Sequence, residues 1–409
     1  MVLASISVGC ICLFLLSKKK FSISWFFVFV WTVCLSLSCL GLYGINKPSD
    51  TVVFLACSSM LIFTFVALGK CPILRMGEKS SNRNNNVNKS PTNKLLLYVL
   101  NVAAYVFSFP YLKKSLSILR TKGIYFVRNA AFDGNGGIGS TAVLMIFQYV
   151  VSSLFLATLI VTVMDVFEKK VKPLAVLFSI LNVLLYTVLF AGRFILLNSI
   201  VIVLFVAIDT DRIRSIIKLI SKHKKILVFC LVVVAGLCFM TLLRTSSTNI
   251  VKSVYVYFTG SFSYLSYLIE KGVCTDLFLL GRAFLGFIYN SICTALTVFL
   301  GVPYNGSDSI ITQLTQFMVP IGGGNSFNAL GSMLHDFIAD FGVFGCLFDV
   351  FLFAIICNNV ERIRLHENTF FSRAVYYYMV MVVVYSVFSY QLRSPSALFC
   401  FVFLYIFCH

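Results

Sequence analysis

The chain has 409 residues, of which 59% are hydrophobic and only 12% are charged. This charged fraction is about half that of a typical soluble domain, which excludes an ordinary soluble fold. Apolar runs long enough to span a bilayer recur along the chain, and they do not alternate polar with apolar residues, which excludes a membrane β-barrel. The formal net charge of +18 therefore predicts basic cytoplasmic loops and no nucleic-acid partner.

The apolar runs predict an all-α polytopic membrane protein with a single transmembrane domain over residues 1–409. About eleven spans are expected, at 1–17, 22–44, 51–69, 95–111, 140–164, 174–191, 194–208, 226–243, 341–359, 374–390 and 396–408. Two further runs, 254–269 and 277–301, either raise the number to 13 or form interfacial or re-entrant helices. The cysteines form no CxxC pair or Cys/His cluster, so we expect no metal and no cofactor.

The distribution of basic residues predicts the orientation. Loops on one side of the membrane hold 21 of the 33 Lys and Arg residues, at 18–20, 70–94, 165–173, 209–225 and 361–373. Because cytoplasmic loops carry the excess of positive charge, this side is cytoplasmic and the N-terminus lies outside. On this cytoplasmic side, the low-complexity stretch SNRNNNVNKSP predicts that residues 70–94 form a linker loop.

Two long segments fall on the outer side, a basic loop at 111–139 and a large segment at 244–340. Loops of this length are usually functional, so chemistry is expected on the outer face. The first loop is rich in basic residues, namely Lys113, Lys114, Arg120, Lys122 and Arg128. They are compatible either with a helix lying on anionic lipid headgroups or with recruitment of an anionic lipid-linked substrate.

Four arginines lie at or near the predicted outer ends of helices: Arg193, Arg244, Arg282 and Arg393. Each one alone is explained by a side chain that extends to the membrane interface. Together with Arg128 of the basic loop they favour a diphosphate-binding site, because the guanidinium fork binds phosphate oxygens in pairs and keeps its charge near a membrane.

The stretch VPIGGGNSFNALGSMLHDFIADFG at 319–342 gathers rare polar groups beside a glycine run. On a helix, Asp336 and Asp340 lie one turn apart, and His335 lies about 100° from Asp336. Such groups near a bilayer usually face a cavity and can accept a proton from a hydroxyl group, with His335 the first candidate base and the aspartates the second. The alternatives are a structural histidine at the interface and a simple helix start at Asp340.

Three further residues are candidates for glycan binding. Asn325 and Asn328 can hydrogen-bond hydroxyl groups or cap the following helix. Tyr264 belongs to a group of tyrosines that either stack on sugar rings or form an aromatic belt at the interface.

This pattern resembles the bacterial O-antigen polymerases, the Wzy-type oligosaccharide repeat-unit polymerases. The likeness covers nearly the whole chain as architecture. Its motifs are an outward-facing arginine in GRFILL (Arg193), an arginine in LLRTSS that opens a long periplasmic loop (Arg244), and NSFNALGSMLHDFIADFGVFG leading into a span. In that last motif the residues similar to the family pattern are Asn325 or Asn328, Asp340, Gly342 and Gly345.

The resemblance implies a metal-independent, GT-C-like membrane glycosyltransferase of the bacterial inner membrane with its active site facing the periplasm. It would transfer the glycan carried on undecaprenyl diphosphate onto a new lipid-linked repeat unit. Its partners would be these lipid-linked oligosaccharides, membrane lipids and a polysaccharide chain-length regulator. Two alternatives stay open: the O-antigen ligase, which shares the architecture, and a flippase or other transporter of lipid-linked oligosaccharides.

The orientation is testable with topology reporters. We expect periplasmic activity for fusions at Thr248 and Asn305 and cytoplasmic activity for a fusion at Asn85, because the 21 basic residues of one side outnumber the 12 of the other. Cytoplasmic activity at Thr248 or Asn305, or periplasmic activity at Asn85, contradicts the orientation.

Overall fold

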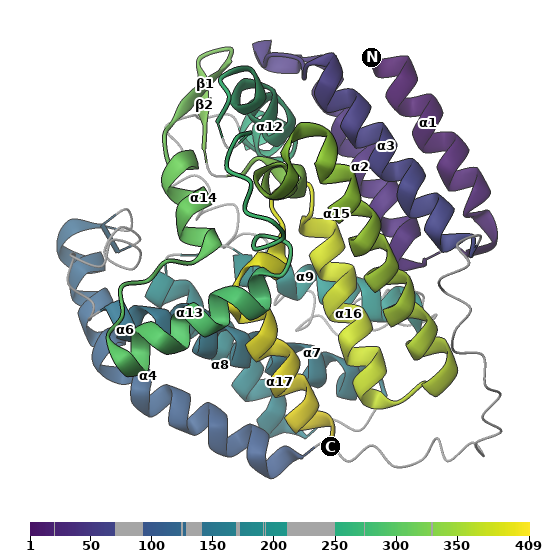
Figure 1. The fold of residues 1–409 in the computed structure, drawn as a ribbon. Coiled ribbons are helices and arrows are strands. Elements are labelled where there is room, and N and C mark those ends of the chain that lie inside the picture. The colour runs from purple at the N-terminus through teal and green to yellow at the C-terminus, as the bar shows by residue number, and fades with distance from the viewer. Residues whose placement is uncertain are drawn as a thin grey trace. The chain divides into compact units, whose positions relative to one another are not determined.

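The computed structural model describes residues 1–19, 21–69, 93–123, 126–127, 141–168, 172–190, 192, 194–210, 250–273, 275–328 and 330–409. Apart from one short hairpin, the regular structure in these residues is helical (Figure 1). The fold class expected from the sequence, all-α, is confirmed at this level.

Helices coincide with ten of the eleven apolar runs. They are α1 (Val2–Leu15), α2 (Ile23–Leu40), α3 (Asp50–Ala67), α4 (Lys94–Lys122), α6 to α7 (Thr141–Met145, the π-helix Ile146–Val151 and Ser152–Phe167), α8 (Pro173–Phe190), α9 (Phe194–Asp209), α15 (Ser332–Glu367), α16 (Phe370–Tyr385) and α17 (Pro395–Cys408). The eleventh run, 226–243, lies outside the described residues.

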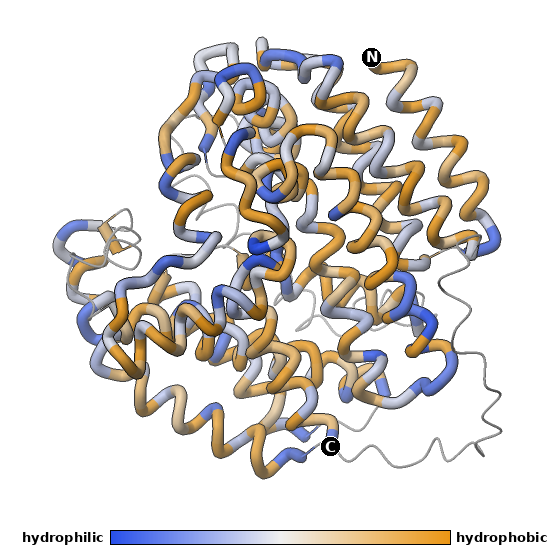
Figure 2. Tube along the Cα trace, in the orientation of Figure 1, coloured by the Kyte–Doolittle hydropathy of each residue, from blue (hydrophilic) through white to orange (hydrophobic). Residues whose placement is uncertain are grey.

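Six helices in the described part of the chain are long and apolar enough to cross a membrane. They are Ile23–Leu40, Asp50–Ala67, Lys94–Lys122, Ala142–Phe167, Pro173–Phe190 and Ser332–Glu367. Their apolar character is visible along the trace in Figure 2. By length and composition, then, the chain is a multi-pass membrane protein.

The described residues of the two outer segments are mostly helical. Helix α4 continues without interruption to Lys122, so the first part of the segment 111–139 is helical. The segment 244–340 holds α12 (Ile250–Glu270), α13 (Gly286–Leu300) and α14 (Ser307–Thr315), followed by the strands β1 (Val319–Gly322) and β2 (Asn325–Phe327). Among the described helices, α12 does not reach the hydropathy of a membrane span, whereas α13 is a shorter apolar helix.

The contacts divide the chain into two compact units. The first comprises Met1–Ser90, Val254–Thr294 and Pro303–Pro395, and the second comprises Pro91–Ser253, Ala295–Val302 and Ser396–His409.

In the first unit, α2, α3 and α15 lie side by side (Figure 1). Their contact faces bury large aromatic side chains, and the rings of Phe27 and Phe63 stack with centroids 3.7 Å apart. The buried indole N–H of Trp31 in this core is paired, as expected for a buried donor. The indole of Trp31 donates to Ser386 Oγ at 2.8 Å, which ties α2 to the end of α16.

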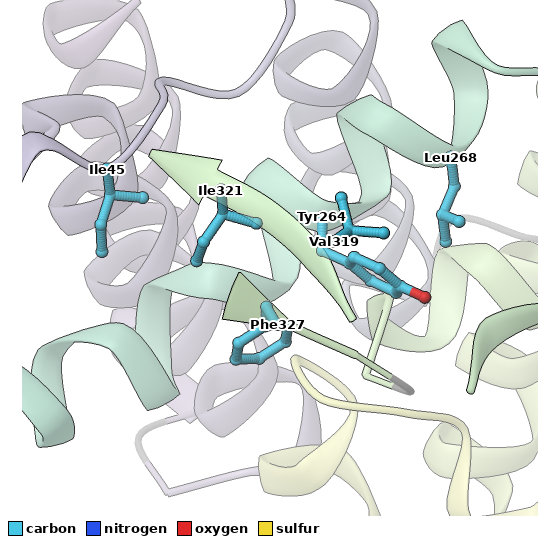
Figure 3. Close-up of a cluster of buried hydrophobic side chains, with 6 residues drawn as sticks. All are labelled: Ile45, Tyr264, Leu268, Val319, Ile321 and Phe327. Atoms are coloured by element: carbon cyan, nitrogen blue, oxygen red, sulfur yellow. The ribbon is translucent and has the colours of Figure 1, made fainter. Parts of the chain in front are cut away.

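A second core of this unit lies under the hairpin. Tyr264 and Leu268 from α12 pack against Val319 and Ile321 of β1 and against Phe327 of β2, and Ile45 from the connection between α2 and α3 completes the cluster (Figure 3). Val319 and Ile321 are alternate residues of β1, which is the pattern that places one face of a hairpin against a core. The cluster fixes the hairpin to α12 and to residues 43–46.

In the second unit, a buried polar network joins α4, α7 and α8. Asn182 Nδ2 donates to Asn101 Oδ1 at 2.7 Å, and Asn101 Nδ2 donates to Thr158 Oγ1 at 3.0 Å. The Tyr105 hydroxyl donates to Asn182 Oδ1 at 2.7 Å. Hydrogen bonds of this kind hold apolar helices together where burial from water gives no driving force.

We expect Asn182→Leu to destabilise this unit by about 1–2 kcal/mol, because it leaves Asn101 Oδ1 without its donor and leaves the Tyr105 hydroxyl with only the carbonyl of Phe178 as an acceptor. Thermal unfolding of the purified protein in detergent measures the loss. Leu184→Ala on the same helix is the matched control, since Leu184 is 56% exposed and its truncation removes no hydrogen bond. An unchanged midpoint for Asn182→Leu contradicts the role of the network.

Candidate functional site

Helix α15 is broken near its beginning. Phe341 (φ −135°, ψ 15°) and Gly342 (φ 75°, ψ −178°) leave the helical conformation. The backbone angles of Gly342 are accessible to glycine and strained for other residues. The break separates a short first segment, 332–340, from the long apolar remainder of the helix.

Carbonyl groups at the end of this first segment accept hydrogen bonds from amides outside the helix. The amide of Leu279 donates to Ala339 O at 2.9 Å, and the amide of Leu280 donates to Asp340 O at 3.2 Å. Carbonyls at a helix end need such partners when they are buried. The residues leading into α13 are therefore docked against the break in α15.

The side chain of Asp340 extends the same contact. It is fully buried, and its Oδ1 accepts from Ala283 N at 2.9 Å while Oδ2 accepts from Phe284 N at 2.7 Å. Hydrogen bonds from amides to a carboxylate are stronger than neutral ones, and the amino end of a helix favours a negative charge. Asp340 thus anchors the start of α13 with both of its oxygens.

Asp336, one turn earlier, anchors a different segment. Its Oδ2 accepts from Tyr390 N at 2.9 Å, and its Oδ1 forms an ion pair with the guanidinium of Arg393. Both partners belong to the turn before α17, which contains the 3-10 helix Gln391–Arg393. Asp336 is also buried, so this pair is shielded from water.

The two anchored segments also bond to each other. The Tyr390 hydroxyl donates to Phe284 O at 3.2 Å, and the two rings stack with centroids 5.9 Å apart and planes at 8°. The contacts therefore run from Asp336 through Tyr390 and Phe284 to Asp340. They form a closed chain because Asp336 and Asp340 lie on the same helical turn. We call these four residues the aspartate clamp.

Two of the five arginines predicted to bind a diphosphate, Arg282 and Arg393, are linked through Asn290 and Ser307. Asn290 on α13 donates to Arg393 O at 2.8 Å and accepts from Ser307 N at 2.8 Å. Ser307 Oγ in turn donates to Arg282 O at 2.8 Å. Asn290 thus couples the backbones of Arg282 and Arg393, which precede α13 and α17 respectively.

The two arginines differ in exposure. Arg282 is exposed, donates from Nε to Leu279 O at 3.1 Å, and lies over the Tyr289 ring at 5.6 Å. Arg393 has a side chain that is 18% exposed and paired with Asp336. Arg282 can meet a ligand in its present position, whereas Arg393 can do so only with the part of its guanidinium that Asp336 leaves open.

His335 lies beside the clamp and takes no part in it. The residue is 4% exposed, and its Nε2 has no hydrogen-bond partner among the residues that the structure describes. The positive charge of Arg393 interacts electrostatically with the imidazole ring of His335. Of the three residues predicted to handle a proton, His335 has an uncommitted ring nitrogen, whereas Asp336 and Asp340 already accept hydrogen bonds on both oxygens.

The glycine run forms the turn of the hairpin. Gly322, Gly323 and Gly324 all have positive φ, at 93°, 58° and 70°. A Cβ on Gly323 would collide with Tyr43 O, and Asn46 N donates to Ile321 O at 2.7 Å. The close backbone approach that the glycines permit is therefore made to residues 43–46 of the chain itself.

The three predicted glycan-binding residues contact the protein's own backbone. Asn325 Nδ2 donates to Gly322 O at 3.0 Å within the hairpin turn, and Asn328 Nδ2 donates to Gln316 O at 3.0 Å. Tyr264 is fully buried in the cluster of Figure 3, and its hydroxyl donates to Thr315 O at 2.9 Å. Their part in binding a glycan stays a prediction.

Three of the predicted diphosphate-binding residues, Arg128, Arg193 and Arg244, lie outside the described residues. The structure adds three residues that the sequence analysis did not single out: Asn290, Tyr390 and the buried Asp349. Each is a polar residue inside or beside an apolar run, and this pattern is the signal in the sequence that could have identified it.

No known protein family, curated protein or solved structure matches this chain.

We expect Asp340→Ala to destabilise the first unit by about 2–4 kcal/mol, because it leaves the buried amides of Ala283 and Phe284 without an acceptor. The measurement is thermal unfolding of the full chain in detergent. Asp276→Ala is the control, since Asp276 is exposed in the same outer segment. Equal midpoints for the two variants would show that Asp340 does not anchor α13.

Proposed function

We propose that this chain polymerises lipid-linked oligosaccharide repeat units of O-antigen, or of a related surface polysaccharide, at the periplasmic face of the bacterial inner membrane. The bond between the glycan and undecaprenyl diphosphate breaks, and a new glycosidic bond forms to a sugar hydroxyl of the next lipid-linked repeat unit. The lipid diphosphate leaves, and the hydroxyl proton passes to a base.

The observation that carries this proposal is the aspartate clamp with its two arginines. Asp336 holds Arg393, and Asp340 holds the amide of the residue next to Arg282. Residues four apart on a helix are neighbours, about 5–6 Å apart at Cβ, so the two anchor points lie close together. Two arginines on segments that are anchored this way suit a diphosphate and would stabilise the charge that develops on it as it leaves.

His335 is the base that this arrangement favours. Its Nε2 lacks a partner in the described part of the chain, whereas the aspartate oxygens are held by donors. A sugar hydroxyl is a weak nucleophile, and a positioned base contributes about 10²–10⁴-fold to such a reaction. Because His335 is 4% exposed, the acceptor reaches it only when neighbouring side chains move.

A transporter of lipid-linked oligosaccharides is the second candidate. The broken helix α15, with buried carboxyl groups on both sides of the break, is a feature that transporters use at their substrate sites. The O-antigen ligase has the same architecture and is separated from the polymerase by its product.

The decisive experiment is reconstitution of the purified full chain with defined lipid-linked repeat units. We expect glycan polymer from the wild type and a rate about ten- to hundred-fold lower for Arg282→Ala, which corresponds to the loss of about 1.5–3 kcal/mol from one charged hydrogen bond. Arg282→Lys should not restore the rate, because an ammonium group cannot reproduce the paired fork. Arg282 is exposed, so these variants should fold.

Lys271→Ala is the matched control, since Lys271 is an exposed basic residue of the same outer segment. Normal polymer length from Arg282→Ala at equal abundance refutes the diphosphate role. In cells lacking the chain, a surface glycan reduced to one capped repeat indicates a polymerase and total loss of capped core indicates a ligase. Cytoplasmic accumulation of lipid-linked repeats indicates a flippase.

A further inference from the structure

A third buried carboxyl group lies beyond the break in α15. Asp349 follows Gly342 by about two helical turns and is 1% exposed. Neither of its carboxyl oxygens has a hydrogen-bond partner among the residues that the structure describes. An ionised carboxylate that is buried without a partner is strongly unfavourable, so this group calls for an explanation.

The carboxyl group of Asp349 lies close enough to the buried carboxyl group of Asp340 for the two to interact electrostatically. Asp340 has its oxygens directed at the amides of Ala283 and Phe284, which favours its ionised form. An ionised carboxylate accepts hydrogen bonds and cannot donate them. Two ionised groups in this position would therefore repel each other without forming any bond.

We propose that Asp349 binds a proton, shares it with Asp340, and thereby forms an internal proton-binding site at the break in α15. The added proton makes an O–H bond on Asp349, and this group donates to the carboxylate of Asp340. One proton removes the repulsion and gives Asp349 its missing partner. The site is present whether or not the chain polymerises glycans.

Other groups near Asp349 do not replace the proton. Among the described residues, the titratable side chains that interact with it besides Asp340 are Cys346 and Tyr390, neither of which carries a positive charge. Of the helices packed on α15, α2 contains no charged residue, α3 has Asp50 at its first position, and α16 has Arg373 in its first turn. The nearby cation Arg393 is paired with Asp336.

A metal cation fits this place poorly. The described residues contain no group of three or more His, Cys, Asp or Glu side chains that could hold one. The oxygens of Asp340 are already directed at amides, which leaves Asp349 to supply most of the ligands. A proton needs only one donor oxygen and one acceptor oxygen, and the pair offers both.

The proton is coupled to the aspartate clamp through Asp340. Removing it leaves two negative charges facing each other in a buried place, where repulsion is strong. This repulsion weakens the hydrogen bonds that Asp340 accepts from Ala283 and Phe284. It therefore loosens the segment that carries Arg282. Protonation of Asp349 therefore stabilises the arrangement of the clamp.

Infrared spectroscopy of the purified full chain tests the proposal directly, because a protonated carboxyl group and a carboxylate absorb at different frequencies. At neutral pH we expect a protonated-carboxyl band in the wild type, a loss equivalent to one carboxyl group in Asp349→Asn, and no loss in Asp276→Asn at the exposed control position. The amide of the Asp349→Asn variant can still donate to Asp340, so this variant should fold. Asp349→Leu cannot donate, and its thermal midpoint should fall below that of Asp349→Asn.

A wild-type spectrum without a protonated-carboxyl band at neutral pH overturns the proposal without need of any variant. So does a band that persists unchanged in Asp349→Asn. If Asp349→Asn does not accumulate, Asp340→Asn takes its place: the band must shift in frequency when its acceptor changes, and an unshifted band overturns the proposal.

Discussion

The site depends on the spacing of two carboxylates. Asp336 and Asp340 lie four residues apart on a buried helical segment, and each holds a segment distant in sequence. Because hydrogen bonds to a carboxylate are about twice as strong as neutral ones and are unscreened when buried, the positions of α13 and of the turn before α17 follow from this one turn of helix. The residues on those segments, including Arg282 and Arg393, are positioned by these contacts.

The break in α15 at Gly342 and the aspartate clamp depend on each other. A helix interrupted inside an apolar protein exposes backbone groups that nothing apolar can satisfy. The amides of Leu279 and Leu280 bond to carbonyls at the end of the first helical segment, and the Asp340 side chain then holds the next turn. The interruption is tolerated because the polar groups it creates are used to dock another segment. A binding site can be built at such a point without leaving unpaired backbone in the interior.

The sequence predicted the helices well, because hydropathy and length are properties of each run alone. It also located the stretch 319–342, since histidine and aspartate beside an apolar run are conspicuous. It did not predict what these residues contact. A glycine run permits close backbone approach, but no local pattern in the sequence indicates that Gly323 lies against Tyr43. Asp349 and Asn290 do not stand out in the sequence, because a single polar residue within an apolar run does not alter the prediction of a helix. Their importance comes from the partners that folding brings to them.

The contact between the hairpin and residues 43–46 has a consequence for biosynthesis. Asn46 receives its carbonyl partner from Ile321, about 275 residues later in the chain. At a synthesis rate of about 5–20 residues per second, the connection between α2 and α3 waits on the order of 15–60 s for this partner. During that time α1 to α3 can already be inserted while the amide of Asn46 relies on water or headgroups. Completion of the first unit is thus a late event, and a ribosome that stops before residue 327 leaves an inserted but unfinished protein whose open backbone a quality-control protease can recognise.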